Sequence, residues 1–159
     1  MEIIIGVADM KVSNDSEAVL ITYSLGSCIG LGIYDSIEKV GGLLHYMLPE
    51  SSLDSVKAKN NPCMFADTGI PLLFKEAYKL GAKKHSIKTI VVGGSQILDQ
   101  KGFFNIGERN FTALRKIFWR NNVMISYQHI GGNVNRTIKL EIKSGEAWLK
   151  ISGSGYQRI

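Results

Sequence analysis

A cysteine at the end of a short turn is the residue best placed for nucleophilic chemistry. Residues 22–28, Thr-Tyr-Ser-Leu-Gly-Ser-Cys, read as the end of a strand, a Gly-Ser turn and the start of another strand. Such a turn can expose the Cys28 thiol and leave the backbone N–H groups of Ser27 and Cys28 free, as a nucleophile beside an oxyanion hole requires. Free cysteine is also a common small buried residue, so the turn by itself leaves that alternative open.

A histidine further along the chain can assist this thiol. His45 ends an apolar run, and in an antiparallel hairpin the end of the second strand lies beside the start of the first, so we expect Cys28 and His45 to be cross-strand neighbours. The imidazole could then raise the thiolate fraction and later deliver a proton. The Thr22 hydroxyl could accept the other imidazole N–H and fix the tautomer. A buried core histidine and an ordinary strand threonine are the alternatives.

The elements that must position these residues are groups of strands in the first and last thirds of the chain. Between these groups lie two helices separated by one further strand. Runs of β-branched and apolar residues predict the strands, and apolar residues at helical spacing predict the helices. The predicted strands are 18–24, 29–34, 40–48, 87–92, 124–128, 137–142 and 147–151; the predicted helices are 67–81, capped by Asp67 or Thr68, and 107–121; residues 49–62 are predicted to be a long loop. This order favours an α+β fold in which two helices cover stacked, mostly antiparallel sheets.

Composition argues against several other classes of protein. Nineteen Lys and Arg against fourteen Asp and Glu give a net charge of +5, and the densest basic stretch, 83–88, has no aromatic residues, so a nucleic-acid surface is not indicated. The two cysteines, Cys28 and Cys63, form neither a CxxC motif nor a Cys/His cluster, which argues against structural zinc and a disulfide scaffold. Without a signal-like or membrane-spanning stretch, we expect a cytoplasmic single domain over residues 1–159 that needs no cofactor or metal.

Several segments in order give the chain a resemblance to a known family. Thr22, Cys28 and His45 are separated by five and sixteen residues, within Leu-Gly-Ser-Cys and His-x-Met-Leu-Pro. The later segments are the helix from Asp67 to Gly81-Ala82, Gly93-Gly94-Ser95, Ile106-Gly107-Glu108-Arg109-Asn110 and Gly131-Gly132-Asn133-Val134-Asn135-Arg136. In these segments, and across most of its length, the chain resembles the CheD family of chemoreceptor glutamine deamidases.

The resemblance implies a fold, an activity and partners. The implied fold is a three-layer α-β-β sandwich, similar to the catalytic domain of cytotoxic necrotizing factor toxins. The implied roles are Cys28 as nucleophile, His45 as general base and acid, and Thr22 as the residue that orients His45. The implied substrates are glutamines on the cytoplasmic helices of methyl-accepting chemotaxis receptors, and the implied partner is a CheC-type phosphatase. His129 departs from the acidic residue that is usual two positions before the double glycine, and we expect it to affect packing or partner contacts.

Two alternatives to a receptor deamidase stay open. The same residues suit another cysteine hydrolase, and the chain could instead be a binding regulator of a receptor or phosphatase with an incidental thiol. The apolar cluster Phe103, Phe104 and Ile106 is a candidate groove for a substrate helix and for the CheC-type partner, with core packing as its alternative. The residues interpreted as structural or surface positions are Cys63, His85, Arg109, Asn110 and Arg136.

Overall fold

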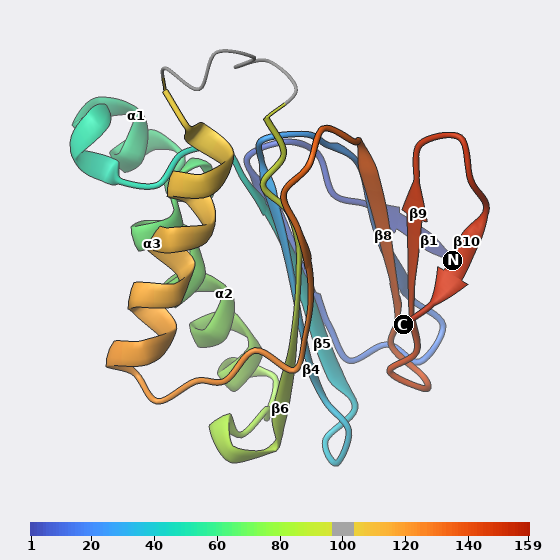
Figure 1. The fold of residues 1–159 in the computed structure, drawn as a ribbon. Helices are drawn as coiled ribbons and strands as arrows, with labels where there is room; N and C mark the ends of the chain where they lie inside the picture. The colour runs from blue at the N-terminus through green and yellow to red at the C-terminus, as the bar shows by residue number, and fades with distance from the viewer. Residues whose placement is uncertain (97–103) are drawn as a thin grey trace.

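The chain folds into three layers, a pair of helices and two five-stranded sheets (Figure 1). A computed structural model describes residues 1–96 and 104–159. The central sheet contains, in spatial order, β2 (Asp9–Ser13), β5 (Val40–Tyr46), β4 (Ile29–Asp35), β6 (Ile87–Gly93) and β7 (Tyr127–Ile130). The outer sheet contains β1 (Glu2–Ile4), β3 (Val19–Leu25), β8 (Arg136–Glu141), β9 (Ala147–Ile151) and β10 (Tyr156–Arg158). Only the β1–β3 and β6–β7 pairs are parallel among these strands, so the predicted α+β sandwich with mostly antiparallel sheets is confirmed.

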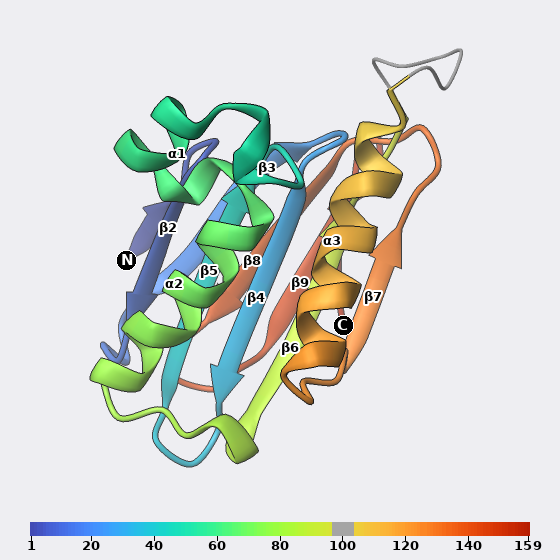
Figure 2. The same ribbon diagram turned by 90° about the vertical axis from the view of Figure 1, so that its left-hand side faces the viewer.

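The central sheet is covered on both faces. Every residue of β4 and β5 is buried. Because side chains alternate along a strand, Leu44 and Tyr46 face the helices while Leu43 faces the outer sheet. Figure 2 shows the two long helices, α2 (Ala66–Lys79) and α3 (Ile106–Arg120), packed on the face of the central sheet that is turned away from the outer sheet.

The helices follow the apolar spacing of the sequence. In α2, Ile70, Leu73 and Phe74 are buried, and in α3 Leu114 and Phe118 are buried. Helix α2 ends at Lys79, and the chain reverses at Gly81 with a φ of 104°, a left-handed conformation that favours glycine. None of the described helices is long and apolar enough to cross a membrane.

The segment predicted to be a long loop is in fact largely helical. It contains the short elements η1 (Ser51–Leu53), α1 (Ser55–Asn60) and η2 (Pro62–Met64). The reason is local capping, because the Asp54 carboxylate accepts from the Lys57 N–H and the Asn61 side chain accepts from the Cys63 N–H.

The prediction that Asp67 or Thr68 caps the first long helix is wrong. Phe65 is the N-cap of α2 and makes no side-chain cap bond. The Asp67 carboxylate instead accepts two hydrogen bonds from Ser51, and the Thr68 hydroxyl donates to the Pro62 carbonyl.

Strands at the edges of the sheets were harder to predict from the sequence. Strands β1, β2 and β10 were not predicted, and β7 begins three residues later than the predicted 124–128 strand. Before β7, the Thr89 hydroxyl donates to the Met124 carbonyl and the Ser126 hydroxyl accepts from the Thr89 N–H. A backbone bond from the Ser126 N–H to the Thr89 carbonyl accompanies these side-chain bonds, and the regular strand pairing starts at Tyr127 opposite Ile90.

Candidate active site

The β4–β5 hairpin places Cys28 and His45 on the same face of the central sheet. His45 pairs with Gly30, and Cys28 lies two residues before Gly30, which makes Cys28 a diagonal neighbour of His45. A Cβ at Gly30 would meet side-chain atoms of Leu25 and Ile138, so this face is the one directed at the outer sheet. Cys28 is half-buried and packs against the cluster between the sheets. The predicted hairpin is therefore confirmed, and it brings Cys28 and His45 onto neighbouring strands as expected.

Thr22 comes from the outer sheet and contacts His45 across the space between the sheets. Its Oγ1 lies 2.7 Å from His45 Nδ1 and 2.7 Å from the Ile5 carbonyl oxygen. A carbonyl can only accept, so the single hydroxyl proton goes to Ile5, and Nδ1 must be the protonated nitrogen that donates to Thr22. His45 Nε2 is then left with its lone pair, and this buried atom has no hydrogen-bond partner in the described part of the chain. An imidazole in this state can accept a proton at Nε2.

Burial keeps both reactive groups neutral. It lowers the pKa of His45 to about 4 and raises the pKa of the Cys28 thiol to about 11, because desolvation penalises the charged form of each. The sequence-based expectation of an imidazolium that increases the thiolate fraction is therefore not met at rest. At neutral pH the pair is a thiol beside a neutral imidazole.

The turn before Cys28 is held by its carbonyl groups. The Gly26 carbonyl accepts from the Ser95 N–H at 2.9 Å, the Ser27 carbonyl from Asn110 Nδ2 at 2.9 Å, and the Cys28 carbonyl from the Gly94 N–H at 3.0 Å. Among the described residues, the Ser27 and Cys28 N–H groups donate to no backbone carbonyl, and the Cys28 N–H lies close enough to its own thiol to lower the pKa of that group. N–H groups in this position beside a thiol can bind an oxyanion.

Asn110 joins the two parts of the site. This residue of α3 is fully buried, and its Nδ2 donates to the carbonyls of both Ser27 and Met47. It thereby ties the turn before Cys28 to the chain that follows His45. Sequence reasoning interpreted Asn110 as a structural residue and did not place it at the site. The sequence does contain a signal for it. Asn110 lies four and eight positions before the buried Leu114 and Phe118, so it is a polar residue on the buried face of the same helix.

Arg136 supports the same turn from the other side. It is 3% exposed and donates to the Gly93 and Gly131 carbonyls, to the Ser95 hydroxyl and to His129 Nδ1. His129 accepts this bond as a neutral imidazole, and its pKa is lowered by burial and by the Arg136 charge. Gly93 must be small, because a Cβ there would collide with the Cys28 carbonyl.

The remaining candidate residues contribute no hydrogen bond to this cluster among the described residues. Phe103 falls outside the described residues, Phe104 is 68% exposed, and Ile106 is the half-buried first residue of α3. Cys63 is buried in η2 and His85 is exposed in η3. In the described part of the chain, no three His, Cys, Asp or Glu side chains come together as metal ligands would.

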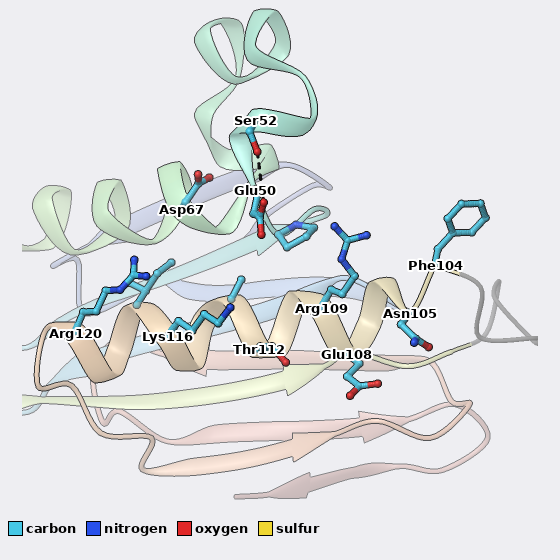
Figure 3. A pocket seen from close by; sticks show the side chains of 13 residues that line it. Glu50, Ser52, Asp67, Phe104, Asn105, Glu108, Arg109, Thr112, Lys116 and Arg120 are labelled. Atoms are coloured by element: carbon cyan, nitrogen blue, oxygen red, sulfur yellow. Dashed lines mark hydrogen bonds between the residues drawn. The ribbon is translucent and has the colours of Figure 1, made fainter.

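A groove runs along α3. It has a volume of about 710 Å³ and lies between α3 and the turn at Pro49–Ser52, with Phe104 at one end and Arg120 at the other (Figure 3). Pro49 and Arg109 are among the residues that line it. Pro49 follows Met47 by two residues and Arg109 precedes Asn110, and the Asn110 side chain donates to the Met47 carbonyl.

Comparison with known proteins shows which family the chain belongs to. The family model described as CheD chemotactic sensory transduction matches residues 47–151. A probable chemoreceptor glutamine deamidase CheD 1 of Syntrophus aciditrophicus is 56% identical over 158 residues, 99% of each chain. A probable chemoreceptor glutamine deamidase CheD of Solibacter usitatus is 47% identical over 152 residues, 96% of this chain and 90% of the relative. The chain therefore belongs to the CheD family.

Proposed function

We propose that this protein hydrolyses glutamine side-chain amides of methyl-accepting chemotaxis receptors to glutamate and ammonia. The relatives are named as chemoreceptor glutamine deamidases over nearly the whole chain. The observation that carries the proposal is the Thr22–His45 hydrogen bond, which leaves His45 Nε2 unprotonated on the face that also carries Cys28. We also propose a cytoplasmic location and a CheC-type phosphatase as partner, both supported by the family resemblance.

The reaction runs through a thioester. Cys28 Sγ attacks the carboxamide carbon while its proton passes to His45 Nε2, and the N–H groups of Ser27 and Cys28 bind the developing oxyanion. The tetrahedral intermediate collapses as His45 gives that proton to the departing nitrogen, which leaves as ammonia. Water then attacks the thioester carbon, its proton passing to His45 and on to the Cys28 sulfur, and the glutamate side chain is released.

The neutral resting pair suits a concerted first step. With a thiol pKa of about 11, a preformed thiolate is rare at pH 7, so proton transfer to His45 accompanies attack on the substrate. A histidine with a low pKa is fully unprotonated at pH 7 and is thus always ready to accept.

Mass spectrometry of a receptor cytoplasmic fragment tests the function directly. Incubation with the protein should convert specific glutamines to glutamates, with matching ammonia release. A fragment that binds but keeps every amide would favour the alternative of a binding regulator. Conversion of unrelated amide substrates alone would favour a different cysteine hydrolase.

Thr22 should act through the tautomer of His45. We expect Thr22→Val to lower kcat within the roughly 10²–10⁴-fold range of general acid–base catalysis, because Nδ1 loses its acceptor. The variant should also be less stable by about 1–3 kcal/mol, since Ile5 and His45 are left with unpaired buried groups. Thr22→Ser keeps the hydroxyl and should restore kcat. If Ser and Val variants had equal kcat values, the orienting role would be wrong.

Asn110 should act as a positioning residue for Cys28. We expect Asn110→Ala to lower kcat by about 10²-fold with little change in KM, because small displacements of reacting groups carry costs of this size. Asn121→Ala is the matched control, since among the described residues the Asn121 side-chain amide bonds only to the Ile117 carbonyl of the preceding helix. Steady-state kinetics with both variants, at a temperature where both are folded, would contradict the role if kcat fell equally in the two.

A further inference from the structure

Three cations form a stripe along the groove wall of α3. Arg109, Lys116 and Arg120 are seven and four residues apart, so they share one side of the helix over about 16 Å. All three are exposed, and Figure 3 shows them along the side of α3 that borders the groove. None of the three takes part in an ion pair with another described residue.

The acidic residues across the groove are already engaged. The Asp67 carboxylate accepts from the Ser51 N–H at 2.9 Å and from its hydroxyl at 2.7 Å. Glu50 accepts a longer bond of 3.4 Å from Ser52. Glu108 also lines the groove, with its side chain pointing away from that of Arg109 in Figure 3, and it forms no ion pair with another described residue. The cations therefore remain available to an outside partner.

Two residues that line the groove are close in sequence to the residues that hold the nucleophile's turn. Arg109 precedes Asn110, whose side chain donates to the Ser27 carbonyl beside Cys28. Pro49 lines the groove two residues after Met47, the other acceptor of the same amide. The groove lining is thus connected through Asn110 to the turn that carries Cys28, although neither Cys28 nor His45 lines the groove itself.

We propose that the groove binds an acidic helical segment of the receptor, adjacent to the glutamine that is deamidated, and that Arg109, Lys116 and Arg120 pair with its carboxylates. This inference rests on the proposed function. Carboxylates spaced at helical intervals match cations spaced at helical intervals. The exposed Phe104 side chain at the groove's end provides apolar contact.

The charge pattern favours a protein helix over a nucleic acid or an anionic membrane. A nucleic acid or an anionic membrane carries negative charge on all of its surface. In this groove it would therefore also be repelled by the carboxylates of Glu50 and Asp67 on the wall that faces α3. A helix with carboxylates on one face can pair with the stripe and turn its neutral face to that wall. The groove therefore selects a segment by the placement of its acidic residues.

Charge reversal tests the groove through binding, independently of turnover. In a Cys28→Ala background, Lys116→Glu/Arg120→Glu is titrated with a purified cytoplasmic receptor fragment. Its Kd should rise about 3- to 10-fold at low salt, given typical exposed ion pairs, and the difference should shrink as salt is raised. The control is Lys143→Glu/Lys75→Glu, which makes the same change in net charge with exposed lysines outside the groove lining.

Kinetics in the Cys28-containing protein give the second readout. The same double reversal should raise KM for the receptor fragment and leave kcat unchanged, and substituting lysines for acidic residues of the fragment should restore KM. Equal Kd values for the groove and control variants would overturn the proposal. It would also be overturned if the Lys116→Glu/Arg120→Glu variant lost binding to DNA or anionic vesicles but bound the receptor fragment as the parent protein does. If the wild type binds the fragment at the groove without deamidating it, the proposed function fails while the groove assignment stands.

Discussion

Replacing Cys28 with alanine is expected to abolish receptor deamidation while the protein stays folded and still binds the receptor. The nucleophile forms the only covalent bond to the substrate in the proposed reaction. Loss of a nucleophile that works with a paired base costs on the order of 10⁶-fold in kcat in the subtilisin example of serine hydrolysis. Ammonia release and mass spectrometry of the receptor fragment measure the loss.

The second cysteine is the natural control for this result. Cys63 is 8% exposed in η2, and Cys63→Ala should keep wild-type turnover apart from a modest loss of stability. Iodoacetamide should label Cys28 before Cys63, because Cys28 is the more exposed of the two thiols. Turnover by Cys28→Ala at the wild-type rate would remove the thioester from the mechanism.

Replacing His45 with glutamine is the second large effect. We expect a roughly 10²–10⁴-fold loss of kcat, because no other group in the proposed mechanism takes the thiol proton. Alkylation of Cys28 by iodoacetamide should continue in the variant, which separates loss of the base from loss of the nucleophile. Unchanged kcat in a folded His45→Gln protein would contradict the assignment.

The pH profile of the wild type should carry the signature of the buried pair. His45 must be neutral to accept a proton, and its pKa is lowered from 6.5 to about 4, so kcat/KM should stay level through pH 6.5 and fall as pH drops through about 4. On the alkaline side, iodoacetamide labelling of Cys28 should keep increasing toward pH 11 as thiolate forms. An acid limb centred near 6.5 would place the base in a solvated environment instead.

Local pattern was enough to predict the parts of the site that are close in the chain. Cys28 and His45 belong to one hairpin. Its short polar turn sets which residues lie opposite each other, and the alternating direction of side chains along each strand sets which of them share a face. The helices followed from apolar stripes such as Ile70, Leu73 and Phe74. The family resemblance supplied the roles of Thr22, Cys28 and His45 and the three-layer arrangement. Short edge strands and capped turns were missed because three to six residues carry too little periodicity to identify an element.

Only the tertiary structure decided how the site is held and in which protonation state it rests. Thr22 and His45 lie in different sheets, so their contact depends on how the sheets stack, and Asn110 reaches Ser27 across 83 positions of sequence. The same packing removes water from the Cys28–His45 pair, and desolvation shifts each pKa away from its charged form. Residue types along the chain suggested a thiolate beside an imidazolium. Burial, which no local pattern contains, makes the pair neutral.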